Sequence, residues 1–260
     1  MSEAVLRTLY LDLMKKSILG FIVEDKSLAS FPSLNLTEAN LTTQDFNRKL
    51  REHGQDWPSQ AQSMIGLKRM DNIQKCVEQV ISDRVPGDLI ETGVWRGGAT
   101  IFMQAILKAY GIRDRNVWVA DSFEGLPAPN IKKYPADTGL DLSNIQVLAV
   151  TIEEVRSNFE RYGLLDEQVR FLKGWFRDTL PTAPIEQLAV LRLDGDLYES
   201  TMDSISNLYP KLSVGGYVII DDYQIPACAK AIHDYREQNN ITEKILVIDE
   251  TGVFWRREQN

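Results

Sequence analysis

The sequence predicts an α/β fold built on a doubly wound, mostly parallel sheet with an N-terminal helical extension. Five short apolar runs have the length of buried strands, at residues 88–92, 117–121, 169–174, 188–194 and 217–222. Helical stretches separate most of these runs, at residues 98–111, 153–163, 199–212 and 227–240. Such alternation implies parallel crossovers. Two final runs, 245–249 and 252–257, are expected to add an antiparallel hairpin at the sheet edge and so to complete seven strands.

The first part of the chain differs from the rest. Residues 1–60 carry no strong strand signal and are expected to form the helical extension, whereas residues 61–260 form the main domain. Residues 25–47 are rich in Ser, Asn, Thr and Pro, which indicates loops. An N-terminal amphipathic helix is predicted from the spacing of its apolar residues, Val5, Leu6, Leu9, Tyr10, Leu13 and Met14. A second helix is predicted over 61–82, with an inward face made of Met64, Ile65, Leu67, Ile73 and Val77.

The composition argues against nucleic-acid and membrane partners. The 260 residues hold 37 acidic and 29 basic side chains, for a net charge of −8, whereas binding to nucleic acid or to an anionic membrane needs a positive face. No apolar stretch is long enough to span a bilayer, and the first twenty residues do not read as a signal peptide. The two cysteines, Cys76 and Cys228, are too few for a disulfide framework. We therefore expect a globular cytoplasmic protein.

The ends of the predicted strands carry an unusual number of acids. Ligands of open parallel sheets bind outside the carboxyl ends of the strands, and carboxylates there cost free energy unless they are solvated, paired or metal-bound. Seven residues stand at these positions, and all except Gly174 are acids: Glu91, Asp121, Gly174, Asp194, Asp196, Asp221 and Asp222. This edge of the sheet is the expected functional site.

The turn after the first predicted strand, Glu91-Thr92-Gly93-Val94-Trp95-Arg96-Gly97-Gly98, differs in spacing from the dinucleotide-binding G-x-G-x-x-G. It is closer to the acidic-x-Gly-x-x-x-Gly loop of methyltransferases that bind S-adenosylmethionine, and Glu91 suits a ligand with an ammonium group. The alternative is a plain glycine-rich turn. Asp121 ends the next strand, where an acid can accept hydrogen bonds from ribose hydroxyls. Its alternative role is a helix N-cap.

Three further acids predict a metal site. Asp194, Asp221 and Asp222 come from two strand ends expected to be adjacent, and convergent carboxylates suit a hard cation such as Mg²⁺. No Cys or His cluster lies nearby, which disfavours structural zinc. Asp196 is two residues further and can lie beside the metal. The alternative is a set of caps and solvated turns.

Two other features lie near this edge. The long, proline-containing segment 126–150 is expected to be a lid above the strand ends. Trp175 and Phe176 follow another strand end, where they can either stack on an adenine or belong to the core. His53 and His233 lack a neighbouring nucleophile, and His233 is expected on an exposed helix face.

Several motifs, in order along the chain, together resemble the macrocin-type (TylF-like) O-methyltransferases, which methylate sugar hydroxyls on natural products. The motifs are SMIGLKRMDN, ETGVWRGGA, VADSFEGLP, FLKGWFRDTLP, RLDGDLYEST and GGYVIIDDY. The resemblance runs from about residue 60 to the end, with a weaker match over 8–22. It implies a Rossmann-like class I methyltransferase fold, the cofactors S-adenosylmethionine and Mg²⁺, a glycosylated small-molecule acceptor and a homo-oligomer.

The resemblance also implies roles for individual residues. Asp194, Asp221 and Asp222 would bind the metal, and Asp196 would be the general base. The predicted cofactor site comprises Ser63, Met64, Glu91, Thr92, Gly93, Val94, Trp95, Asp121, Ser122, Gly174, Trp175 and Phe176. The hypothesis is therefore Mg²⁺-dependent methyl transfer to a sugar hydroxyl. Its alternatives are a catechol-type O-methyltransferase and a non-catalytic cofactor-binding protein, and the glycine spacing disfavours a dehydrogenase.

Overall fold

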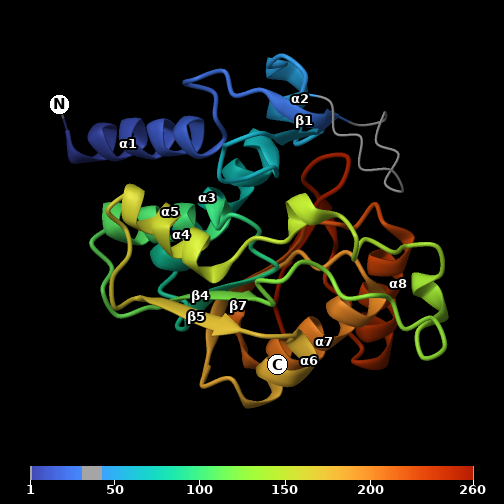
Figure 1. The fold of residues 1–260 in the computed structure, drawn as a ribbon. Helices are drawn as coiled ribbons and strands as arrows, with labels where there is room; N and C mark the ends of the chain where they lie inside the picture. The colour runs from blue at the N-terminus through green and yellow to red at the C-terminus, as the bar shows by residue number, and fades with distance from the viewer. Residues whose placement is uncertain (1, 31–42, 260) are drawn as a thin grey trace.

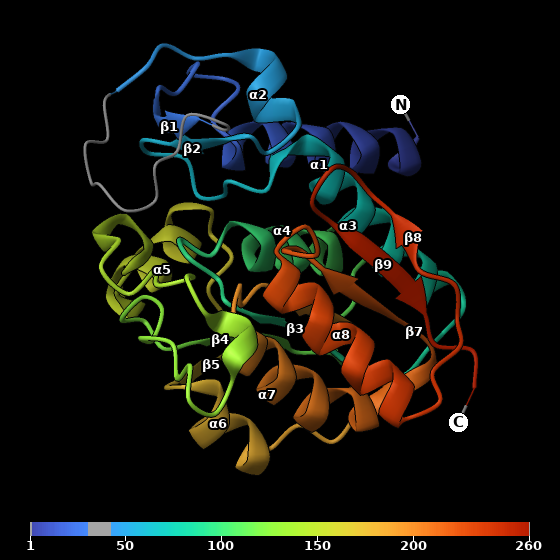
Figure 2. The same ribbon diagram turned by 90° about the vertical axis from the view of Figure 1, so that its right-hand side faces the viewer.

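The computed structural model describes residues 2–30 and 43–259 and shows a seven-stranded sheet between two layers of helices (Figures 1 and 2). The strands lie in the order β5 (Val169–Lys173), β4 (Val117–Asp121), β3 (Asp88–Thr92), β6 (Leu188–Leu193), β7 (Leu212–Ile220), β9 (Val253–Arg256) and β8 (Leu246–Val247). The first five are parallel, and β8 and β9 form the predicted antiparallel hairpin at the edge. In the described part of the chain, no helix is long and apolar enough to cross a membrane.

Successive strand residues face two separate hydrophobic cores, as the pleat of a strand requires. In β3, Leu89 joins the core beneath α3 (Gly66–Ser82), α4 (Gly98–Ala109) and α5 (Ile152–Arg161). Ile90 joins the core beneath α7 (Tyr198–Leu208) and α8 (Pro226–Gln238), with the short α6 (Phe176–Thr179) beside it. Because both faces are covered, the central strands β3, β4, β6 and β7 are mostly apolar, which made them predictable. The edge strand β5 also carries the exposed Arg170 and Lys173.

The N-terminal part contains a small sheet that the sequence pattern did not predict. Strand β1 (Ser27–Ser30) pairs with β2 (Asp56–Pro58), and α2 (Arg48–Glu52) lies beside them. The fully buried Arg51 holds this unit together: its guanidinium binds Asp56 and the carbonyl oxygens of Leu19 and Asp25. Such short strands depend on tertiary contacts and leave no periodic signal. Part of the predicted loop-rich segment 25–47 lies outside the described residues.

Helix α1 (Glu3–Ile18) forms where it was predicted, but most of its predicted apolar face is not buried. The side chains packed against the core are Leu11, Met14 and Ile18. Of the predicted face only Met14 is buried; Val5, Leu6, Leu9, Tyr10 and Leu13 are all at least 36% exposed. Figure 1 shows α1 on the side of the molecule opposite α6 and α7.

Two predicted helix boundaries were wrong for physical reasons. Helix α3 begins at Gly66, not at residue 61, because Gly66 has a φ of 78° and breaks the helical geometry before it. Ile65, Ile73 and Val77 are buried as predicted, but Met64 and Leu67 only partly. Helix α7 ends at Leu208 instead of running to 212, because Pro210 cannot continue it. A 3₁₀ turn, η4 (Tyr209–Lys211), leads directly into β7.

Candidate active site

A cavity of about 290 Å³ opens at the carboxyl ends of the parallel strands, where the sequence predicted the site. Its wall combines the 62–65 segment, the glycine-rich loop, the lid and the acidic strand ends. Among the predicted site residues, those that line it are Ser63, Met64, Glu91, Gly93, Val94, Trp95, Asp121, Ser122, Trp175, Phe176, Asp194, Asp196, Asp221 and Asp222. Thr92 and Gly174 do not line it; Thr92 is fully buried beneath the wall.

The glycines of the loop after β3 are required by close chain crossings. Gly93 has a φ of 86°, and a Cβ there would lie 1.7 Å from the carbonyl oxygen of Asp194. A Cβ on Gly98 would lie 2.5 Å from the carbonyl oxygen of Gln62, which accepts the Gly98 N–H at 2.9 Å. The loop can therefore place β3 against β6 and hold the 62–65 segment over the cavity only with glycine at these positions.

Glu91 presents an unpartnered oxygen in the cavity wall. Its side chain is 2% exposed, and Arg192 donates to its Oε1. Oε2 is buried without a hydrogen-bond partner among the described residues. Burial raises the pKa of Glu91 to about 8, against the opposing effect of Arg192. An ammonium group at this position would satisfy the free oxygen and favour the ionised form.

Asp121 lines the cavity and also binds the backbone of the loops beside it. Its carboxylate accepts the N–H of Val94 at 2.7 Å and that of Phe123 at 2.8 Å. Burial raises the pKa of Asp121, and these two backbone donors oppose that effect. The residues after Asp121 form a loop and not a helix, so the alternative role as a helix N-cap is wrong. Asp121 instead fixes the glycine-rich loop and lines the cavity.

The three predicted metal ligands converge. Carboxylate oxygens of Asp194, Asp221 and Asp222 lie within 4.8 Å of one another. Burial and the Asp221 charge raise the pKa of Asp194 to about 6, and burial and the Asp196 charge raise the pKa of Asp222. The donor set is entirely oxygen and its charges repel, so a hard divalent cation fits the cluster.

Asp196 stands beside this trio. It has a φ of 55°, and its N–H donates to Asp222 Oδ2 at 3.1 Å. Burial, followed by the charges of Asp194 and Asp221, raises the pKa of Asp196 to about 7. A carboxyl group with a pKa near neutrality is well matched to general-base chemistry.

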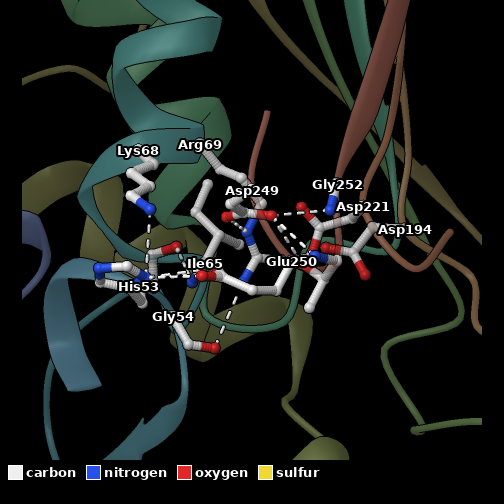
Figure 3. Close-up of polar contacts among 12 residues, drawn as sticks. His53, Gly54, Ile65, Lys68, Arg69, Asp194, Asp221, Asp249, Glu250 and Gly252 are labelled. Atoms are coloured by element: carbon white, nitrogen blue, oxygen red, sulfur yellow. Dashed lines mark hydrogen bonds and ion pairs between the residues drawn. The ribbon is translucent and has the colours of Figure 1, made fainter. Parts of the chain in front are cut away.

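Two buried arginines that the sequence analysis did not single out organise these acids. Arg192 in β6 is fully buried and contacts Glu91, Asp194 and Asp221. Arg69 in α3 contacts Asp221 from the other side (Figure 3). A signal for Arg192 was available, since an arginine inside the apolar run LAVLRLD must find a partner when buried.

Hydrogen bonds from α7 and from Trp95 hold the lid. Asp137, in the 3₁₀ turn η1 (Pro135–Asp137), is fully buried and accepts the N–H groups of Tyr198 at 2.6 Å and Glu199 at 3.3 Å. It therefore caps α7, whose own N-cap residue provides no side-chain hydrogen bond. Near the C-terminal end of the lid, Trp95 Nε1 donates to the carbonyl oxygen of Val147 at 2.8 Å. The lid contributes apolar residues to the cavity wall, including Leu140, Leu142 and Leu148.

We expect Asp137→Ala to lower the free energy of unfolding by about 0.5–2 kcal/mol, because the cap of α7 is lost. It should also make the lid more sensitive to limited proteolysis. The matched control is Asp141→Ala, which removes an exposed lid carboxylate bonded only within its own turn. Denaturant unfolding and peptide mapping of the digests measure both effects. Equal behaviour of the two variants would show that Asp137 does not hold the lid.

Comparison with known proteins identifies the family. The family described as macrocin-O-methyltransferase (TylF) matches residues 7–257. This chain belongs to that family. One relative of the enzyme, 8-demethyl-8-(2,3-dimethoxy-alpha-L-rhamnosyl)-tetracenomycin-C 4'-O-methyltransferase from Streptomyces olivaceus, is 56% identical over 96% of this chain and 93% of its own. Demethyldecarbamoylnovobiocin O-methyltransferase from Streptomyces niveus is 54% identical over 96% and 94%, respectively. Mycinamicin III 3''-O-methyltransferase from Micromonospora griseorubida is 52% identical over 96% of each.

Solved structures agree with this assignment. The O-methyltransferase NovP superposes with a TM-score of 0.89 and 53% identity, over 97% of this chain and 100% of that one. The calicheamicin methyltransferase CalS11, at 20% identity and a TM-score of 0.59 over 73% and 79%, shares the fold. The predicted family and Rossmann-like methyltransferase fold are confirmed, and the enzyme is an S-adenosylmethionine-dependent O-methyltransferase.

Proposed function

We propose that this enzyme transfers a methyl group from S-adenosylmethionine to a sugar hydroxyl of a glycosylated natural product, with Mg²⁺ bound by Asp194, Asp221 and Asp222. The observation that carries the proposal is the carboxylate trio with Asp196 beside it, in one cavity with Glu91 and Asp121. The printed names of the three relatives support the acceptor class, because each is an O-methyltransferase of a tetracenomycin, novobiocin or mycinamicin compound.

Residues of the cavity wall would hold the cofactor. The free oxygen of Glu91 would receive the ammonium group of the cofactor, and Asp121 would accept a hydrogen bond from its ribose. Trp175 and Phe176 line the cavity and would contact the adenine, and Ser63 and Met64, which also line it, would cover the cofactor. Gly93, Val94 and Ser122 also line the cavity, and Thr92 and Gly174, which stand next to lining residues, would shape it through the backbone.

Asp196 acts as the general base. It accepts the hydroxyl proton as the oxygen–methyl bond forms and the sulfur–methyl bond breaks, which releases S-adenosylhomocysteine. A bound cation would lower the pKa of the acceptor hydroxyl and orient it. The closely spaced carboxylates of Asp194, Asp221 and Asp222, together with the lid, would hold the reacting groups in the orientation that methyl transfer needs.

Metal removal tests this proposal. In EDTA, turnover of a deoxysugar-bearing glycoside should fall by more than ~100-fold, because several kcal/mol of transition-state stabilisation are lost. Mg²⁺ should restore it, and calorimetric titration with S-adenosylhomocysteine should give similar affinity in both buffers. Free catechols, run in parallel with mass-spectrometric detection, test the catechol-type alternative. Unchanged turnover in EDTA would refute the metal assignment, and preferred methylation of catechols would refute the acceptor class.

We also propose that the enzyme self-associates through α1 and the turn after it. Six apolar side chains there are 47–75% exposed: Val5, Leu6, Leu9, Leu13, Ile22 and Val23. Apolar side chains exposed together on one helix and the turn after it are typical of an interface. Both cysteines are free and buried, in accord with the proposed cytoplasmic location.

The double change Leu9→Glu and Leu13→Glu should therefore shift the sedimentation coefficient to that of a monomer, because it places charges in the apolar interface. Lys173→Glu changes the net charge by the same amount on the distant strand β5 and serves as the control. Sedimentation velocity measures the result. If the wild-type enzyme is itself monomeric, or if the double variant keeps its oligomeric state, this interface is excluded.

A further inference from the structure

Arg69 connects three segments that are far apart in the sequence. It lies in the first turn of α3 and is 5% exposed. Its Nη1 donates to Asp221 Oδ2, its Nη2 donates to the carbonyl oxygen of Gly54 at 3.3 Å, and its Nε lies 3.1 Å from Asp249 Oδ2 (Figure 3). One guanidinium thus joins the end of β7, the turn before β2 and the turn between β8 and β9.

The Asp221 carboxylate is held from two sides. Oδ2 accepts from Arg69, whereas Oδ1 accepts from Arg192. The side chain is 6% exposed, so no solvent competes for these contacts. Two planar cations on opposite oxygens leave the carboxylate little freedom to rotate. The orientation of Asp221 therefore depends on a residue outside the methyltransferase sheet.

The contact with Gly54 is possible only because two chain segments cross at glycines. A Cβ on Gly54, whose φ is 62°, would lie 2.2 Å from Arg69 Nη2, and a Cβ on Gly66 would lie 2.2 Å from Gly54 N. From this crossing the chain runs through β2 to residues 62–65, which line the cavity. We call residues 54–65 the cover segment. Arg69 anchors its first residue.

The third partner of Arg69 is Asp249, which lies in the turn between β8 and β9 and stabilises that turn with its own side chain. Asp249 Oδ1 accepts the N–H groups of Thr251 at 2.9 Å and Gly252 at 2.7 Å. Thr251 itself lines the cavity. Outside this buried junction, His53 Nδ1 lies 3.1 Å from Glu250 and 3.2 Å from Lys68 Nζ. These exposed contacts join the end of α2, the turn between β8 and β9, and α3. These outer contacts provide a natural control.

We propose that Arg69 is a positioning residue that couples the orientation of Asp221 to the placement of the cover segment over the cavity. The inference rests on the proposed function, in which Asp221 helps to hold the cation. A residue that only supplied positive charge could be replaced by lysine. A residue that positions three groups could not, because an ammonium group cannot reproduce the planar fork of the guanidinium.

The test is Arg69→Lys, with His53→Ala as the matched control that disrupts only the outer contacts. Mn²⁺ binding to the cofactor-free protein is followed by electron paramagnetic resonance. Hydrogen exchange of residues 54–65 is followed by mass spectrometry, without metal. We expect Arg69→Lys to weaken Mn²⁺ binding about tenfold, as loss of outer-shell partners of metal ligands does. Exchange in the cover segment should become faster, and the control should resemble wild type in both measurements.

Asp249→Asn is a second variant, to be used if Arg69→Lys does not fold. The Asp249→Asn change weakens the same junction, because it removes the negative charge next to Arg69 Nε. It should move both readouts in the same direction by a smaller amount. Wild-type Mn²⁺ affinity in the folded Arg69→Lys protein, or unchanged exchange in residues 54–65, would overturn the coupling. If the wild-type protein binds no Mn²⁺, the proposed metal role fails, and the exchange measurement alone decides whether Arg69 holds the cover segment.

Discussion

Asp196→Asn is expected to lower turnover by about 10²–10⁴-fold, the usual contribution of a general base, while S-adenosylhomocysteine still binds. The amide cannot accept the hydroxyl proton. The backbone should not change, because asparagine tolerates the left-handed conformation that Asp196 adopts at a φ of 55°. The N–H that donates to Asp222 is also retained. The expected loss is therefore in chemistry and not in folding.

Single-turnover kinetics and calorimetric titration measure these two quantities separately. The control is Asp178→Asn, which removes an acid of α6 whose side chain is 64% exposed. It should leave both quantities unchanged. Near-normal turnover in the Asp196→Asn protein would assign the base to another group. Loss of S-adenosylhomocysteine binding would instead show that Asp196 shapes the cofactor pocket.

Arg192→Met is expected to destabilise the protein by about 3–5 kcal/mol, because it leaves buried carboxylates without their counter-ion. Arg192 contacts Glu91, Asp194 and Asp221 and is fully buried. Methionine approximates the aliphatic stem, so the change removes charge and hydrogen bonds with little loss of packing. If the acids hold a cation as proposed, added Mg²⁺ should recover part of the loss by replacing the missing positive charge.

Urea unfolding followed by circular dichroism, with and without Mg²⁺, measures the change. Arg170→Met is the control, since Arg170 lies on the edge strand β5 with its side chain exposed. A loss below about 1 kcal/mol for Arg192→Met would mean that the acids are protonated or solvated in the native protein and need no counter-ion, contrary to the usual cost of breaking a buried ion pair.

The sheet was predictable from the sequence because burial on both faces demands continuous apolar strands. The five parallel strands and the edge hairpin occur where the runs indicated, within a few residues, except that β7 begins five residues earlier, at Leu212. The acidic residues were predictable because they stand at the ends of these apolar runs. Parallel strands bring their carboxyl ends to one edge, so Asp194, Asp221 and Asp222 had to converge.

The tertiary structure alone decided which groups support these acids. Arg69 and Gly54 lie far from the acids in the chain and belong to no periodic pattern, so only the folded chain could reveal their contacts. The same holds for Asp137, which caps α7 from the lid. The exposed face of α1 is a similar case, because helical spacing shows that an apolar face exists but not what covers it. Sequence patterns report local geometry and burial, which are repeated along the chain. Each contact that positions a residue of the site occurs once, between segments distant in the sequence, and follows only from how those segments pack.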